Sequence, residues 1–155
     1  MTWATISLRK MELKNRINQL ESEAIQISQE LQTASRESSQ EQQMTNLTSN
    51  YQQSLMYADY EKAMDAINSN KKIDASKKQE AIMKVQQRYN QNANVFSSIN
   101  ESKASSLKNV TDAKTKAIEA RKEQVETQLK AANAEYESLG QAMDNDIQKS
   151  AIKLA

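Results

Sequence analysis

Few side chains in this sequence have the types and spacing that catalysis requires. The 155 residues include no histidine and no cysteine, which removes the commonest general base, the commonest metal ligands and every thiol nucleophile. Carboxylate pairs occur at Asp144 and Asp146 and at Glu135 and Glu137, but side chains two residues apart do not share a helix face. The run from Asp144 starts like a calcium loop and lacks the glycine and glutamate that complete one. The sequence therefore predicts no enzyme, no metal site and no cofactor.

One tyrosine motif is compatible with a signal. Tyr57 to Glu61 reads YADYE and fits the Y-x-x-x-[DE] pattern. In this it resembles the export signals of small helical hairpins of the type VII (WXG100-like) system, although the W-x-G turn of that family is absent and this chain is longer. The alternative interpretation is that Tyr57 and Tyr60 pack between helices.

The composition favours long helices as the elements that position these residues. The chain has no proline and one glycine, Gly140, so the residues that build tight turns are almost missing. Aromatic residues make up only 5% of the chain, which disfavours strands. Basic and acidic residues, 21 and 20 in number, are interleaved, which is typical of a solvated helix surface and not of a nucleic-acid-binding stripe.

The first 34 residues contain a regular heptad pattern. Two series of residues recur every seven positions: Ile6, Leu13, Leu20, Ile27 and Ala34, and Trp3, Lys10, Ile17, Ala24 and Leu31. A strict heptad predicts a left-handed coiled coil with a partner helix. Lys10 occupies a core position, where it either fixes the register or extends its amine to solvent near the helix end.

The pattern changes in the middle of the chain. The polar stretch 34–43 leaves open a break in the helix. Apolar residues then return as Met44, Leu47, Tyr51, Leu55 and Ala58, followed by a shifted row of Met56, Tyr60, Ala63 and Ile67. Such a shift indicates a stutter in the heptad. Asn68 to Asp74 is the best turn candidate, and either Asp74 or Ser76 is the expected N-cap of the next helix.

The C-terminal half contains two weaker heptad series. They are Ile82, Tyr89, Phe96, Lys103, Val110 and Ala117, and Val85, Asn92, Ile99, Ser106, Ala113 and Ala120. Polar members weaken the middle, and a break near 90–101 is left open. Further on the spacing approaches that of a straight helix, through Val125, Leu129, Ala132, Tyr136, Leu139, Met143 and Ile147. Gly140 lies inside this pattern, where it either permits close helix approach or is merely tolerated.

These observations predict an all-α protein that forms one elongated unit over residues 1–155. We expect a helix over 4–67, a turn over 68–74 and a helix over 75–154, paired as an antiparallel hairpin or coiled coil. The predicted helix–helix interface consists of large apolar members of these series: Trp3, Ile6, Leu13, Ile17, Leu20, Ile27, Leu31, Ile82, Val85, Tyr89, Phe96, Ile99, Val110, Val125, Leu129, Tyr136, Leu139, Met143 and Ile147. Apolar residues off these series, such as Leu8, Met11, Ile25 and Val95, suggest further helical partners and hence an oligomeric bundle or filament.

The composition also resembles that of exported filament, needle and translocator subunits of flagellar and type III secretion systems. The chain shares with them the lack of cysteine, the abundance of Ser, Asn, Gln and Ala, and terminal helices, here Ile6 to Leu31 and Ile118 to Leu154. The resemblance implies a self-assembling structural subunit, and the alternative is an adaptor or chaperone-like protein that binds another protein's helix. We find no transmembrane segment and no Sec signal, so the expected location is either cytoplasmic or outside the cell by a route without a cleaved signal.

Overall fold

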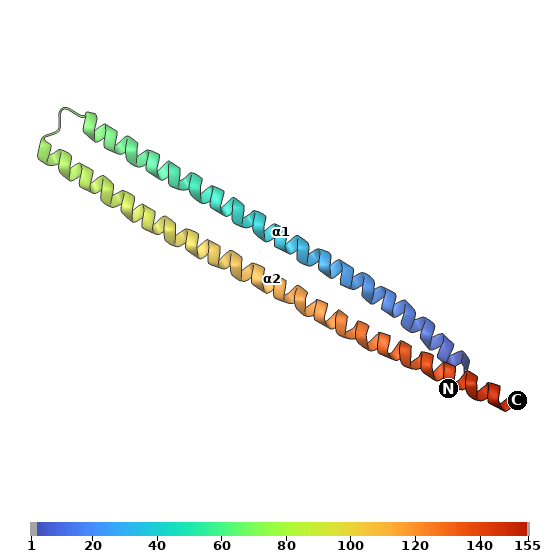
Figure 1. Cartoon of the computed structure of the whole chain (residues 1–155). Coiled ribbons are helices and arrows are strands. Elements are labelled where there is room, and N and C mark those ends of the chain that lie inside the picture. The colour runs from blue at the N-terminus through green and yellow to red at the C-terminus, as the bar shows by residue number, and fades with distance from the viewer. Residues whose placement is uncertain (1–2, 155) are drawn as a thin grey trace. The chain divides into compact units, whose positions relative to one another are not determined.

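The computed structural model describes the backbone of residues 3–154 and the side chains of residues 3–150. The chain forms two helices, α1 (Trp3–Ser69) and α2 (Ala75–Leu154). They lie side by side in opposite directions and are joined by a short turn, shown in green in Figure 1. The protein is therefore an all-α helical hairpin, and the described residues include no strand.

Both helices are continuous where the sequence left a break open. Residues 34–43 lie within α1 and residues 90–101 within α2, and every residue of both stretches is helical. The reason is local. Neither stretch contains glycine or proline. Gln and Glu favour helices, and exposed Ser and Asn lower helix stability without ending a helix.

The turn is shorter than predicted, because α1 continues through Ser69. The side-chain Oδ1 of Asn70 accepts a hydrogen bond from the amide of Lys72 at 3.0 Å, which closes the turn without glycine. Asp74 directly precedes α2, and its carbonyl accepts the first helical bond, from the amide of Lys78 at 2.9 Å. Asp74 rather than Ser76 therefore holds the N-cap position. The Lys78 amine donates to the Asn68 carbonyl at 3.0 Å and caps the end of α1.

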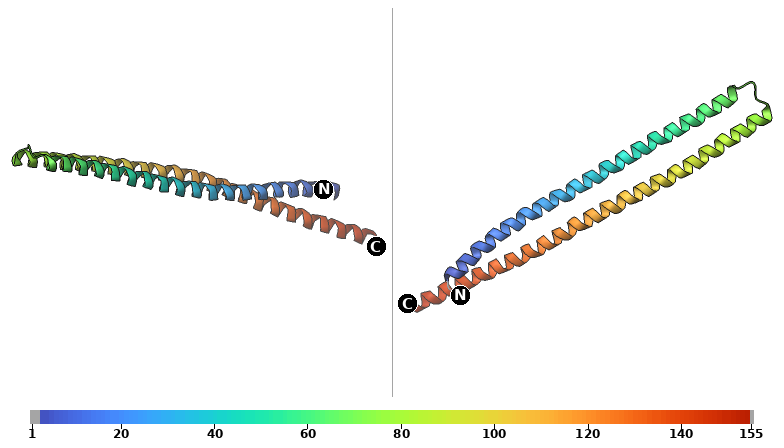
Figure 2. Two further views of the ribbon diagram at one scale, coloured as in Figure 1. Left: turned by 90° about the horizontal axis from the view of Figure 1, so that it is seen from above. Right: turned by 180° about the vertical axis from the view of Figure 1, so that it is seen from behind.

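The packing of the helices divides the hairpin into two compact units. Unit 1 consists of Met1–Ser35 with Ala113–Ala155, and unit 2 consists of Arg36–Asp112. Each unit contains a segment of α1 packed along a segment of α2, and further views of the paired helices are given in Figure 2. The two units pack their helices with different periods.

Unit 1 contains all of the buried residues among those described. On α1 they recur every seven positions, and on α2 they share the same spacing: Ile6, Leu13, Leu20, Ile27 and Ala34, and Ile118, Val125 and Ala132. Half-buried residues, including Ile17, Leu31, Leu129 and Tyr136, pack against this core. On α1 the buried row is the first heptad series of the sequence, whereas Lys10, Ile17, Ala24 and Leu31 of the second series are half-buried. On α2 the predicted heptad members Ala113, Ala117 and Ala120 are exposed, because the buried row runs through Ile118 instead.

Unit 2 has a different repeat. Among residues 36–112, all of which are described, none is buried, and the rows facing between the helices are only half-buried. These rows recur every eleven positions: Thr45, Met56 and Ile67; Ser38, Ser49 and Tyr60; Val85, Phe96 and Leu107; and Tyr89, Asn100 and Thr111. Eleven residues in three turns give about 3.67 residues per turn, close to the value of an unstrained helix.

Candidate helix-binding surfaces

The residue types that could support catalysis do not form a site. The Glu135 carboxylate accepts a hydrogen bond from Arg9 Nε at 2.9 Å, so it serves as a structural partner. Asp144 and Asp146 lie on an exposed part of α2. No group of three or more potential metal ligands occurs among the described residues. The most extensive surfaces of the described residues are those of the paired helices.

Polar pairs join the two helices of unit 1 along one edge of the core. Arg9 Nε lies 2.9 Å from Glu135 Oε1, and Arg16 donates to Gln128 at 3.3 Å. Arg121 lies 3.0 Å from Glu30 and 4.0 Å from Glu23. The α1 members Arg9, Arg16, Glu23 and Glu30 are seven residues apart, and so are the α2 members Glu135, Gln128 and Arg121.

The sign of the charge reverses along this edge, and the reversal specifies the antiparallel register. The Arg9 end of α1 is basic and meets Glu135, whereas the Glu23 and Glu30 end is acidic and meets Arg121. A displacement of one heptad would leave Arg9 opposite the uncharged Gln128 and would remove its ion-pair partner. The hydrogen bond from Arg9 to Glu135, together with the charge of that carboxylate, raises the pKa of Arg9.

Lys10 packs against an aromatic ring at its core position. Its Nζ lies 4.8 Å from the centroid of the Tyr136 ring, which is within the range of a cation–π contact. Lys10 is half-buried, so its charge is held at the seam instead of extending into open solvent. A Cβ added at Gly140 would have Lys10 Nζ as its nearest neighbour, at 3.5 Å, which is an ordinary contact. The helices therefore do not need glycine at this position.

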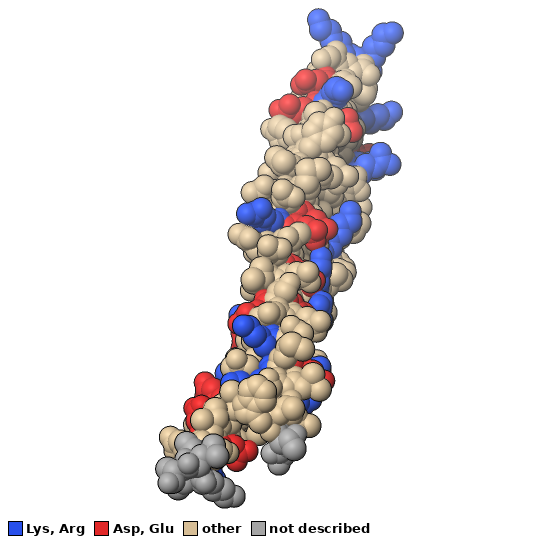
Figure 3. All heavy atoms as spheres, turned by 90° about the vertical axis from the view of Figure 1, so that its right-hand side faces the viewer, with Lys and Arg blue, Asp and Glu red and all other residues tan. Residues whose placement is uncertain are grey.

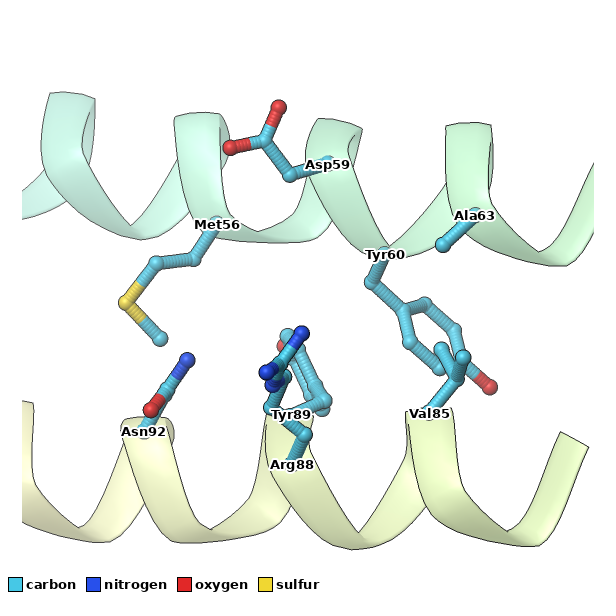
Figure 4. A pocket seen from close by; sticks show the side chains of 8 residues that line it. All are labelled: Met56, Asp59, Tyr60, Ala63, Val85, Arg88, Tyr89 and Asn92. Atoms are coloured by element: carbon cyan, nitrogen blue, oxygen red, sulfur yellow. The ribbon is translucent and has the colours of Figure 1, made fainter. Parts of the chain in front are cut away.

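Three tyrosines cluster between the helices of unit 2. The ring centroids of Tyr60 and Tyr89 are 4.8 Å apart, and Tyr57 lies 6.2 Å from Tyr60 and 6.5 Å from Tyr89. These distances suit aromatic contacts. Figure 4 shows the open groove beside them, lined from both helices by Met56, Asp59, Tyr60, Ala63, Val85, Arg88, Tyr89 and Asn92. The tyrosines therefore supply much of the packing in this part of unit 2.

The Y-x-x-x-[DE] motif is held together within α1. A hydrogen bond from the Tyr57 hydroxyl to Glu61 and the charge of that carboxylate raise the pKa of Tyr57. Tyr57 is also an exposed residue in contact with Tyr60 and Tyr89. The motif residues thus have a structural role in the hairpin, consistent with the packing interpretation of Tyr57 and Tyr60.

The centre of unit 2 is joined by polar groups. Asn100 Nδ2 donates to Ser49 Oγ at 2.7 Å across the helix pair. Nearby, an open groove is lined mainly by polar and small residues of the two helices, including Ser38, Gln42, Thr45 and Ala104. A polar seam of this kind gives little hydrophobic stabilisation.

The predicted interface residues occupy three environments. Buried residues are Ile6, Leu13, Leu20, Ile27 and Val125. Half-buried residues are Ile17, Leu31, Ile82, Val85, Tyr89, Phe96, Leu129, Tyr136, Leu139 and Met143. Exposed residues, which lie outside the seam of the hairpin, are Trp3, Ile99, Val110 and Ile147.

The exposed positions have a physical reason. Val110 falls on the heptad series that starts at Ile82, and Ile99 falls on the series that starts at Val85. This part of α2 follows the eleven-residue repeat, which turns Asn100, Leu107 and Thr111 inward instead. Trp3 and Ile147 lie near the chain ends. The heptad series also omitted two buried residues, Ile118 and Ala132, which the spacing to Val125 could have identified.

Charge and hydropathy on the surface suggest no other class of site. On the face shown in Figure 3, basic and acidic side chains are intermixed, with uncharged areas between them. Within the described part of the chain, neither helix includes a segment that is long and apolar enough to cross a membrane. Comparison of the chain with protein families, with curated proteins and with solved structures finds no match.

Proposed function

We propose that this protein is a non-enzymatic structural subunit that self-associates through its helices, in the manner of a coiled coil. In this function the hairpin supplies two long helical surfaces, and further copies cover the apolar residues that the hairpin leaves outside.

The distribution of the large apolar side chains carries this proposal. Only eight described residues are buried, two of them alanines, whereas fourteen large hydrophobic residues are about half or more exposed. The exposed set is Trp3, Leu8, Met11, Ile25, Met44, Leu47, Tyr51, Leu55, Tyr57, Met83, Val95, Ile99, Val110 and Ile147. Single exposed aliphatics are ordinary, but rows of them along a helix are typical of interaction surfaces.

The mass of the purified protein as a function of concentration tests the proposal. We expect the weight-average mass from sedimentation or light scattering to rise above 17.5 kDa as concentration increases. Replacing Met11, Ile25, Val95 and Val110 by glutamine should lower that mass. Replacing four exposed glutamines by asparagine is the matched control. A compact monomer at high concentration would contradict the proposal, and electron microscopy would distinguish filaments from rings and rods.

A second candidate function is that of an adaptor that binds another protein's helix. The absence of any buried residue in residues 36–112 supports it, because a foreign helix could supply the missing apolar layer. It predicts incomplete helicity in isolation and a gain of helix on mixing, both measurable by circular dichroism. Full helicity and cooperative melting in isolation would count against it.

The resemblance in composition to exported subunits extends the proposal to assembly outside the cell. Fractionation of a culture of the native host, with detection by antibody, tests this part separately. Protein confined to the cell would remove the export proposal and leave self-association in place.

A further inference from the structure

Over residues 44–58 of α1, in unit 2, most of the large apolar side chains lie on the outside. Its outer row, Met44, Leu47, Tyr51, Leu55 and Ala58, follows the eleven-residue spacing of the unit. Met44, Leu47, Tyr51 and Leu55 are 64%, 65%, 65% and 47% exposed. The side facing α2 holds Thr45 and Ser49 at the same level, and Tyr51 lies roughly half a turn around the helix from Ser49. In this segment the polar side thus faces α2 and is half-buried, whereas Met44, Leu47, Tyr51 and Leu55 are exposed.

The charge pattern indicates that the outer row binds protein. No residue from Gln42 to Ala58 is charged, whereas Glu41 and Asp59 bracket the segment. The positions flanking the row are uncharged as well, among them Thr48 and Ser54. Depletion of charge with enrichment of Tyr and Met is the composition found at the centres of protein interfaces.

The spacing of the outer row is symmetrical about Tyr51. Its members are three, four, four and three residues apart, so reversing the row leaves its spacing unchanged. A two-fold axis at Tyr51 would place Leu47 against Leu55 of a second copy and Met44 against Ala58, a large residue against a small one. Self-complementarity under a two-fold axis is what an isologous dimer interface requires.

We propose that the outer row of α1 binds the outer row of a second copy of this chain, antiparallel, with Tyr51 at the two-fold axis. This inference rests on the self-association proposed above and identifies one contact through which it occurs.

Charges at the ends of the row favour the antiparallel arrangement. Arg36 precedes Leu47 by eleven residues and Lys62 follows Tyr51 by eleven, so both cations lie on the outer side of α1. A parallel pair would place Arg36 opposite Arg36 and Lys62 opposite Lys62, and like charges directly opposed destabilise a helix pair. The antiparallel pair places Lys62 opposite Gln40 and Arg36 opposite Ala66.

The length of the row sets the strength of the contact. From Met44 to Ala58 it spans roughly 21 Å at about 1.5 Å per residue. A single helix pair of this length buries less than the roughly 800 Å² per partner of a stable interface. The dimer is therefore weak and concentration-dependent, and it gains strength where several contacts act together in an assembly.

Cysteine crosslinking tests the pairing in the full chain, which has no native cysteine. Gln40 and Lys62 lie eleven residues before and after Tyr51, on the same side of α1. They are not members of the outer row, so Gln40→Cys and Lys62→Cys leave that row intact. We expect a short bismaleimide to link a mixture of the two variants and to leave each variant alone unlinked. In the antiparallel dimer, identical positions are roughly 33 Å apart.

A charge placed at the axis supplies the matched comparison. Tyr51→Glu should lower the yield of linked product at least about tenfold, because a buried carboxylate pair would meet at the axis. Asn50→Glu adds the same charge one residue away, about 100° around the helix, and should change the yield little. Circular dichroism of both variants verifies that the hairpin still folds.

Each other outcome overturns the inference. Linkage of either single variant to itself indicates parallel pairing. A mass above that of the monomer without mixed linkage indicates self-association through another surface, so that the proposed function stands and this inference fails. A monomer at all concentrations removes both.

Discussion

At the centre of unit 1, Leu20, Ile27 and Val125 fill the space between the helices, whereas at the centre of unit 2 that space holds Ser49 and Asn100. Unit 1 repeats every seven residues and unit 2 every eleven. In unit 1 the helices thus pack through apolar residues, with ion pairs that specify the register. In unit 2 they pack through polar residues and a cluster of tyrosines. Both segments are helical, although only unit 1 has a buried core.

The two units differ in how strongly the packing of their helices stabilises the hairpin. Unit 1 has buried layers and cross-helix ion pairs that specify its register, so it holds the hairpin closed. Unit 2 has no buried residue and leaves Met44, Leu47, Tyr51 and Leu55 exposed, so it gains less hydrophobic stabilisation from the pairing of its helices. If the proposed self-association holds, stability and assembly depend on different parts of the chain.

Truncation of a buried isoleucine should give the largest difference in stability between the two units. Ile27 is 0% exposed, and Ile27→Ala should lower the free energy of unfolding by about 3 kcal/mol. Ile82→Ala removes the same groups from a half-buried site of unit 2 and should cost about 1 kcal/mol. Urea denaturation with amide hydrogen exchange measures both. Equal losses would show that the two units are equally well packed.

Replacing the polar bridge should make unit 2 resemble unit 1. The double variant Ser49→Ala with Asn100→Leu exchanges a hydrogen bond for apolar contact and should stabilise the hairpin by about 1–2 kcal/mol. Ser49→Ala alone removes the acceptor and should be neutral to mildly destabilising. Thermal melting compares the two. A double variant less stable than the wild type would mean that the bridge, and not apolar contact, holds this segment.

Gly140→Ala should strengthen unit 1 by a smaller amount. The added Cβ meets Lys10 Nζ at 3.5 Å, and alanine favours helix over glycine by about 0.8 kcal/mol. Ala134→Gly, at an exposed position of the same helix, is the reverse control and should lose a similar amount. If Gly140→Ala destabilises in thermal melts, the backbone at this position needs more room than the hairpin alone shows.

Lowering the pH should have the smallest effect on stability. A hydrogen bond from Lys84 at 2.7 Å, together with its charge, lowers the pKa of Glu80 in unit 2. Because the folded-state pKa is depressed, the associated stability is present above the ordinary value of about 4.3 and is lost as pH falls through the folded value. Melting temperatures measured from pH 7 to pH 3 should fall slightly less in Lys84→Gln. Both side chains are exposed, so a large difference would contradict this account.

The fold could be read from the sequence because its determinants are local. The lack of proline and the single glycine predict long helices, and the series from Ile6 to Ala34 matches the buried row of α1. Asp74 could be named as a cap because a polar residue before an apolar period is a local signal.

The interface was harder to predict where the period changes. Counting by sevens from Ile82 reaches Tyr89 and Phe96 and then Lys103 and Val110, which are exposed. The inward residues Asn100 and Thr111 are polar, so hydropathy does not identify them. Only the eleven-residue spacing shared with Tyr89 does so. The sequence shows the outer row as an apolar series. It does not show that this row faces away from α2, because the residues that face α2 at this level, Thr45 and Ser49, are polar.

The eleven-residue spacing of unit 2 also restricts how the length of the hairpin can change. Removing eleven residues, or three turns, from α1 and from α2 together keeps every remaining side chain on its face. A deletion from one helix alone would separate Ser49 from Asn100. It would also change the partners of the residues between the deletion and the chain ends. In unit 1 the corresponding step is seven residues, or two turns. We therefore expect natural length variants of this hairpin to differ by matched blocks in both helices, with a larger block in unit 2 than in unit 1.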